Sequence, residues 1–134
     1  MRRLHLVIGI VAVAAFVTTG QIMGRHQPPL STLTDATRLL YRSRHIYILA
    51  AGLVNLMLGL YFQAAFPGWR RVVQTVGSVL AVIAPVSLVL AFASEPATGL
   101  PLENGWASYG LFALFGGCML HAVAVIVRPR KLYD

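Results

Sequence analysis

Charged side chains are missing from most of this 134-residue chain. Only 11% of its residues are charged, whereas about a quarter are charged in an ordinary soluble domain. All of the charged residues lie outside four apolar stretches, which are residues 4–24, 46–69, 72–94 and 104–127. Because a helix rises about 1.5 Å per residue, about 20 apolar residues cross the roughly 30 Å of hydrocarbon in a bilayer. Each stretch is long enough, so the sequence excludes a soluble protein and predicts four membrane spans.

The four stretches predict an all-α membrane protein in which the whole chain, residues 1–134, forms one domain. A chain of this length with four spans has no room for a separate water-soluble domain. Short connections between successive spans favour an up-down four-helix bundle. We place the four transmembrane helices at residues 4–24, 46–66, 72–94 and 105–127.

The connection between the first two spans is predicted to contain a further helix. Pro28 and Pro29 cannot continue the helix of the first span and hold the chain extended. Ser31 or Thr32 can then cap a new helix, and an aspartate in its first turn complements the helix dipole. We therefore expect an amphipathic interfacial helix at residues 31–44, which lies on the outer membrane surface and bends into the second span. The alternative is one long helix in which these residues extend the second span out of the membrane.

The connection between the third and fourth spans is predicted to be an irregular turn on the outer side. Residues 94–103 contain two prolines, one glycine and two acidic residues. Proline interrupts a helix because it lacks the backbone N–H. We therefore end the third helix at Ser94 and place Glu95 in the loop, which leaves no acidic residue within any span.

Acidic residues are few, four against eleven basic ones, so the chain carries a net charge of +7. The basic residues flank the spans and form no single patch, so we expect anionic lipid headgroups, and not nucleic acid, as their partner. With the N-terminus inside, seven basic residues lie inside and four outside. The positive-inside rule therefore predicts both termini in the cytoplasm of a bacterial-type inner membrane. A cleaved signal peptide over residues 1–24 is the alternative, but its apolar run is longer than is typical and no A-x-A site ends it.

One cysteine, Cys118, excludes an intramolecular disulfide and any zinc site that needs several thiolates. A haem held by two histidines needs two imidazoles at similar depth on facing helices. Counting helical rise from the flanking charges places His5 nearer the surface than His121 by about 7 Å. The sequence therefore predicts no metal and no cofactor.

Familiar catalytic motifs are also absent from the sequence. It contains no G-x-S-x-G, H-E-x-x-H, Walker-type or G-x-G-x-x-G pattern. Its four acidic residues fall in the connections between predicted spans or at the chain end, so paired-carboxylate chemistry is not expected. The absence of an acid within any predicted span also weighs against proton-coupled transport. We therefore predict that the protein is not an enzyme and has no catalytic residues.

The first group of polar residues that the sequence does contain lies at the predicted outer interface. It consists of Arg38, Arg42, Arg44 and His45. Arg38, Arg42 and His45 follow one another at helical spacing, so their donors can converge on one anion, such as a phospholipid headgroup. The alternative is a solvated basic face that only anchors the helix at the membrane surface.

The second group is a polar seam inside the predicted bundle. It consists of Asn55, Gln63, Gln74, Ser78 and His121, and small residues accompany it on each helix. One interpretation is that these side chains satisfy one another between helices, as polar residues in membrane bundles do. The other is a narrow hydrated path or a small-solute site along the seam.

The missing catalytic and coupling residues, together with glycine-rich helix faces, favour a non-enzymatic role. We predict a small accessory or scaffolding subunit that packs against another membrane protein or against copies of itself as an oligomer. Two alternatives stay open. One is a small channel or transporter along the polar seam. The other is a lipid- or haem-binding membrane protein that uses the basic group or His121.

Overall fold

The computed structural model describes residues 1–63, 68–98 and 105–126, and their regular structure is entirely helical. The elements are α1 (Arg2–Gly24), a short 3₁₀ helix η1 (Leu30–Thr32), α2 (Asp35–Tyr61), α3 (Trp69–Thr98) and α4 (Trp106–Ile126). Each of the four α-helices is long and apolar enough to cross a membrane. The predicted all-α class with four long apolar helices is thereby confirmed.

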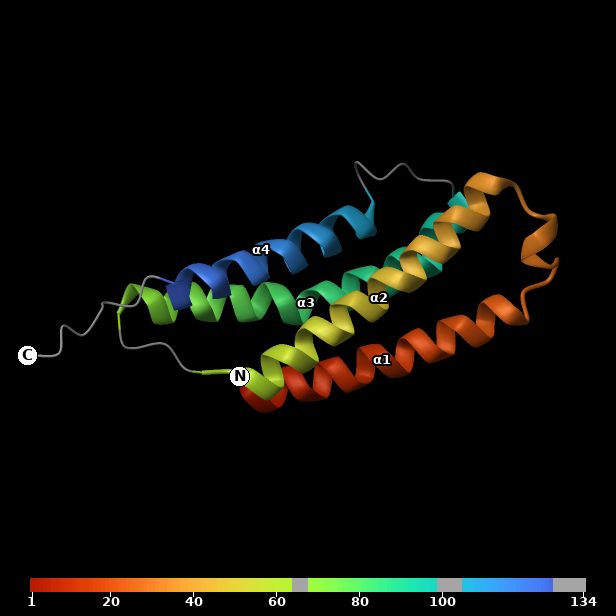
Figure 1. Cartoon of the computed structure of the whole chain (residues 1–134). Helices are drawn as coiled ribbons and strands as arrows, with labels where there is room; N and C mark the ends of the chain where they lie inside the picture. Colours follow the sequence, from red (N-terminus) through yellow and green to blue (C-terminus); the bar gives the residue numbers. More distant parts are fainter. Residues whose placement is uncertain (64–67, 99–104, 127–134) are drawn as a thin grey trace, which may run out of the picture.

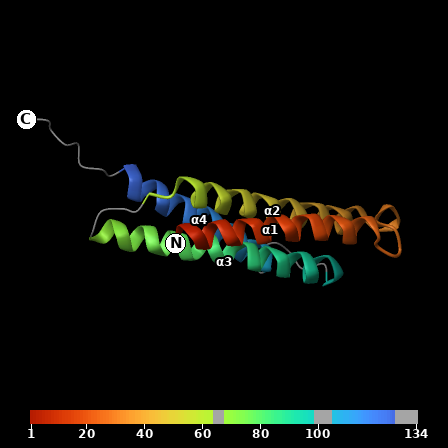
Figure 2. The same cartoon turned by 90° about the horizontal axis from the view of Figure 1, so that it is seen from below.

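The four helices run alternately up and down along one another, as Figures 1 and 2 show. α1 packs mainly on α2 and α3 mainly on α4, while contacts between α2 and α3 join the two pairs. The beginning of α1 and the end of α4 therefore lie at the same end of the bundle (Figure 1). We call this the terminal end, and we call the opposite end, which holds η1, the far end.

Glycines allow the helices of each pair to approach closely. A Cβ atom added to Gly77 of α3 would lie 2.9 Å from the carbonyl oxygen of Gly117 in α4. On the other pair, a Cβ added to Gly9 of α1 or Gly59 of α2 would meet a leucine of the partner helix at 2.7 Å or less. Small residues at such positions are typical of helix contacts in membranes, where lipid does not drive apolar surfaces together. These glycine faces are therefore used inside the bundle.

The second helix does not have the predicted division into an interfacial segment and a span. α2 is continuous from Asp35 to Tyr61, so a separate amphipathic helix at residues 31–44 is wrong. Thr34 caps it, since its hydroxyl accepts a hydrogen bond from the backbone N–H of Thr37 at 3.3 Å. No proline or glycine interrupts the chain from Thr34 until Gly52, so nothing breaks the helical hydrogen bonds where a bend was expected.

The third helix is longer than predicted. α3 continues to Thr98, so the interpretation of residues 94–98 as irregular loop is wrong, while residues 99–103 of that predicted loop lie outside the described residues. The hydroxyls of Ser94 and Thr98 each donate to a backbone carbonyl one turn earlier, at 2.8 and 3.0 Å. Glu95 is consequently a helical residue.

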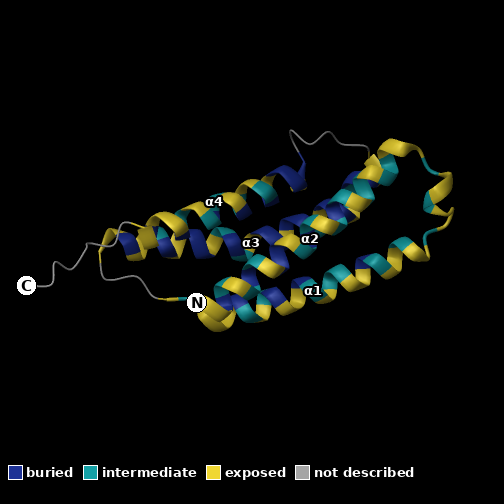
Figure 3. Ribbon diagram, in the orientation of Figure 1, coloured by how far each residue is buried: buried dark blue, intermediate teal, exposed yellow. Residues whose placement is uncertain are grey.

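The core lies between α2, α3 and α4, and the outward faces of the helices are exposed (Figure 3). Its buried apolar residues are Ile48, Ala51, Ala84, Leu88, Phe92 and Leu114. The exposed faces carry many large apolar side chains, and Phe112 of α4, for example, is 77% exposed. Apolar exposure on this scale is typical of helices that face lipid.

Candidate functional site

A buried hydrogen-bond group joins α1, α2 and α3 toward the terminal end. His5 of α1 and Asn55 of α2 are both fully buried, with the histidine Nδ1 2.8 Å from the asparagine Oδ1. The amide nitrogen of Asn55 donates to the carbonyl oxygens of Ala51, at 2.9 Å, and of Ala81, at 2.7 Å. One asparagine thus connects its own helix to both neighbours.

This group determines which nitrogen of His5 carries the proton. Carbonyl oxygens only accept, so the NH₂ group of Asn55 faces them and its oxygen faces His5. That oxygen can only accept as well, so Nδ1 of His5 must be the donor. In the neutral ring Nε2 then keeps its lone pair, and Nε2 is buried without a hydrogen-bond partner among the described residues.

His121 of α4 lies beside His5. The centroids of the two rings are 6.1 Å apart in an edge-to-face arrangement, and the ring of Phe62 lies 6.0 Å from each. Nε2 of His121 is 3.1 Å from the hydroxyl oxygen of Ser78 in α3. Histidines from the first and last helices are therefore brought together at the terminal end.

The predicted separation in depth between these two histidines is wrong. It was counted from the flanking charges as about 7 Å, whereas the ring centroids are only 6.1 Å apart in all. His5 is three residues inside the start of α1, and His121 is five residues inside the end of α4. A difference of two residues is only about 3 Å of helical rise, which a small tilt or shift of one helix removes.

A pocket of about 440 Å³ opens next to His121. It is lined by Leu58, Tyr61, Phe62, Gln63, Gln74, His121, Ala122 and Val125. Gln74 donates a hydrogen bond through Nε2 to the carbonyl oxygen of Gln63 at 2.7 Å, across the opening between α2 and α3. A mostly apolar cavity with a few converging polar groups is the usual form of a small-molecule site.

Two arginines fix the helix ends around this pocket. Arg2 donates through Nε to the carbonyl oxygen of Gly59 at 3.1 Å, in the last turn of α2. Arg70 donates through Nε and Nη2 to the carbonyl oxygen of Ala124 at 3.0 and 2.5 Å, in the last turn of α4. The last carbonyls of a helix lack partners within it and carry its negative dipole end, so arginines suit them.

The structure divides the predicted polar seam between the interior and the pocket. Asn55 bonds to His5 and to backbone, Ser78 bonds to His121, and the remaining members line the pocket. A second pocket, of about 400 Å³, lies toward the far end beside Thr19 and Tyr41. Between the two levels lie fully buried apolar side chains, among them Ile48, Ala51, Ala81 and Ala84. A third pocket, of about 270 Å³, lies at this middle level between α1 and α3; its lining is apolar and shares Ala15 and Val89 with the pocket at Thr19. Among the described residues, buried apolar side chains therefore interrupt the polar seam itself.

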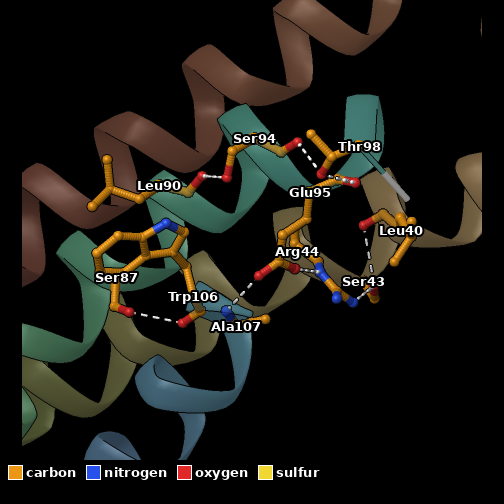
Figure 4. A network of polar contacts seen from close by, with 10 residues as sticks. All are labelled: Leu40, Ser43, Arg44, Ser87, Leu90, Ser94, Glu95, Thr98, Trp106 and Ala107. Carbon is orange, nitrogen blue, oxygen red and sulfur yellow. Dashed lines mark hydrogen bonds and ion pairs between the residues drawn. The ribbon is translucent and has the colours of Figure 1, made fainter. Parts of the chain in front are cut away.

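At the far end, Arg44 of α2 forms a buried ion pair with Glu95 of α3 (Figure 4). Nε of Arg44 is 2.6 Å from Oε2 of Glu95, and the two side chains are 2% and 0% exposed. The other carboxylate oxygen accepts a hydrogen bond from the backbone N–H of Ala107, at 2.8 Å, in the first turn of α4. Glu95 therefore holds three helices together.

Sequence reasoning missed Glu95 because Pro96 suggested that the helix had already ended. We inferred on that basis that no predicted span contains an acidic residue. This is wrong, because α3 extends to Thr98 and contains Glu95. One signal was available in the sequence, which is the excess of arginines at this end, each of which needs a counter-charge if it is buried.

The basic group Arg38, Arg42, Arg44 and His45 does not converge on one point. Arg44 turns toward Glu95, whereas Nδ1 of His45 lies 2.9 Å from the hydroxyl of Thr19 in α1, with its ring stacked on Phe16. Arg38 pairs with Asp35, and Arg42 is exposed. Adjacent helical residues differ by about 100° in direction, which sends Arg44 and His45 to different neighbours. Anion binding by the remaining two arginines stays a prediction.

The chain matches no protein-family model, no curated protein and no solved structure. No function can therefore be carried over from a relative. The histidine pair, the pocket beside it and the buried ion pair are the features from which a function can be argued.

Proposed function

We propose that this protein is a four-span integral membrane protein that binds a small ligand at the terminal end of its bundle and catalyses no reaction on it. The observation that carries the proposal is the buried Nε2 lone pair of His5, next to a second histidine that lines an open pocket. A buried polar atom without a partner costs about 1–3 kcal/mol. A ligand that engages Nε2 removes this cost, so the unliganded site is poised to bind.

Membrane insertion is supported by the four long apolar helices and by their exposed apolar faces. The positive-inside rule then puts the terminal end, with the pocket, on the cytoplasmic side of a bacterial-type inner membrane. Arg3 and Arg71 are exposed at that end, where anionic headgroups would meet them. A reporter fused after residue 134 and active only in the cytoplasm tests this orientation.

Ligand binding has more support than the other two roles that the sequence favoured. The accessory-subunit role rested partly on free glycine faces, and several of these glycines pack inside the bundle, such as Gly77 against Gly117. The channel role needs a path along the polar seam, and fully buried apolar side chains of α2 and α3, such as Ile48 and Ala84, interrupt that seam. Both roles stay predictions that the following experiment also addresses.

Native mass spectrometry of the protein, extracted gently from its own membranes, tests the proposal. Ala122 is exposed and lines the pocket, so Ala122→Trp fills the pocket without disturbing the core. Ala50→Trp is the matched control, because Ala50 is also an exposed alanine but lines none of the pockets.

We expect wild type and Ala50→Trp to carry the same small-molecule mass, and Ala122→Trp to lose it. A wild-type chain that carries no mass other than lipid would contradict the proposal, as would equal retention by all three proteins. If the chain is instead detected in complex with a second polypeptide and without a small molecule, the accessory-subunit role has more support than ligand binding.

A further inference from the structure

We propose that His5 and His121 together ligate one transition-metal centre, either a bare copper ion or the iron of a haem. This inference rests on the proposed function, since it names the ligand of the same site. Both sources share one chemistry, a metal that accepts an imidazole nitrogen from each of two sides.

His5 already has the form that a metal ligand requires. Its Nδ1–H donates to Asn55 and its Nε2 lone pair is vacant among the described residues. Histidines that bind metals almost always donate their other ring N–H to an oxygen in this way, which fixes the tautomer and orients the ring. Asn55 is itself held by two carbonyls, so the ligand atom is fixed by α2 and α3 before any metal arrives.

The spacing of the two rings fits a metal between them. With metal–nitrogen bonds of about 2.0 Å and about 1.2 Å from nitrogen to ring centre, two imidazoles on opposite sides of a metal have centroids about 6.4 Å apart. The centroids of His5 and His121 are 6.1 Å apart. The distance between the rings therefore matches that of a ligated pair, and ligation requires that the ring of His121 turn until its free nitrogen faces Nε2 of His5.

His121 also has a partner that suits a metal ligand. If its Nε2–H donates to the hydroxyl of Ser78, its Nδ1 keeps a lone pair for the metal. His121 lines the pocket, and Phe62 both lines the pocket and contacts the two histidine rings. The pocket is therefore the entry path, and Phe62 is the side chain that an incoming planar group would displace.

The chemistry of the donor set narrows the choice of metal. Imidazole suits copper, iron, zinc and nickel. Two neutral imidazoles bring no negative charge, and the described residues contain no cluster of three His, Cys, Asp or Glu side chains to complete a larger site. Structural zinc needs four ligands and is therefore disfavoured. A cuprous ion accepts two ligands and carries one charge, and haem iron brings four nitrogens and two negative charges of its own.

Wild-type, full-length protein purified in detergent provides the direct test. Separate samples are incubated with haemin, and with copper plus ascorbate so that the metal is cuprous, and are then desalted. We expect one of the two probes to remain at about one per chain. A retained haem gives a Soret band shifted from that of free haemin, whereas retained copper is counted by elemental analysis.

The chain contains four histidines, which provides matched variants. We expect His5→Gln and His121→Gln to lower the retained probe at least tenfold, and His26→Gln and His45→Gln to leave it unchanged. X-ray absorption of the wild-type complex is a second measurement that needs no variant. It should show two imidazole ligands at about 2.0 Å from the metal.

The inference is overturned if the wild-type protein retains neither probe. It is also overturned if His5→Gln and His121→Gln both retain the probe as well as wild type does. Absorption data without imidazole scattering have the same consequence. If metal is absent but wild type carries another small molecule that Ala122→Trp removes, the inference fails while the proposed function stands. If no small molecule of any kind is bound, both fail.

Discussion

Glu95 at the far end and His5 at the terminal end are both completely buried, and each contacts a side chain from another helix. Their hydrogen bonding differs. Both carboxylate oxygens of Glu95 have partners, one in Arg44 and one at the start of α4. Nη2 of Arg44 is buried without a hydrogen-bond partner among the described residues, but it belongs to a cation paired with Glu95. His5 has a partner at Nδ1 and none at Nε2 among the described residues.

This difference separates a structural contact from a binding site. A buried charge is tolerated when an opposite charge and hydrogen bonds compensate it, and such a contact then holds helices together. A buried lone pair that is left vacant lowers the stability of the empty protein, by about 1–3 kcal/mol. The carboxylate of Glu95 is therefore a structural contact between helices, whereas the vacant lone pair of His5 is an acceptor that a ligand can engage.

The largest effect that would test this comparison is expected from Glu95→Ala. The substitution leaves the guanidinium of Arg44 buried without its counter-charge, which typically costs about 3–5 kcal/mol. We expect the free energy of unfolding, measured in detergent micelles, to fall by that amount. Ligand retention at the terminal end, measured below the new melting temperature, should be unchanged.

The double variant Arg44→Met with Glu95→Leu is the control for Glu95→Ala. It removes both charges, and apolar replacements of a buried ion pair are often neutral or stabilising. It should therefore recover at least half of the lost stability. If the Glu95→Ala protein is as stable as wild type, the ion pair does not hold the helices together.

A smaller effect on stability, with a larger one on binding, is expected from Asn55→Leu. It leaves the Nδ1–H of His5 and the carbonyl of Ala81 without partners, at about 1–3 kcal/mol. Loss of the oxygen that orients a ligating histidine should also weaken binding of the retained probe by about 10–100-fold. Thr18→Val, which removes an exposed hydroxyl bonded within α1, should change neither quantity. Unaltered binding by Asn55→Leu would mean that Asn55 does not position His5.

The smallest effect is expected from Arg42→Gln. Arg42 belongs to the predicted anion site but is exposed, and exposed charges contribute about 0–1 kcal/mol. We expect a change in unfolding free energy below about 0.5 kcal/mol, beside the large loss for Arg44→Gln in the same assay. Comparable losses for the two variants would contradict the separation of the basic group that the structure shows.

The four helices were predictable because a segment without charge and of sufficient length has few alternatives to a membrane helix. Their ends were not. Pro96 suggested an end that the buried Glu95 and the hydroxyl of Thr98 override, and the interfacial helix followed from an expected bend that no residue produces. Local signals set where a helix is able to end, and tertiary contacts decide whether it does.

The site was predictable in part. Helical periodicity placed Asn55, Ser78 and His121 on inward faces, and all three are buried and hydrogen-bonded. Periodicity gives the direction of a side chain but not the shift of one helix along another. For that reason the sequence excluded His5 as a neighbour of His121, and only the packed bundle shows that they meet.

The place of these two histidines in the chain also has a consequence for biosynthesis. His5 lies in α1 and His121 in α4, so the ribosome must synthesise α2 and α3 after the first histidine and before the second. A chain that lacks either of the outer helices cannot contain the pair. Occupancy of the site would therefore report, in the cell, that α1 and α4 are both present and packed together.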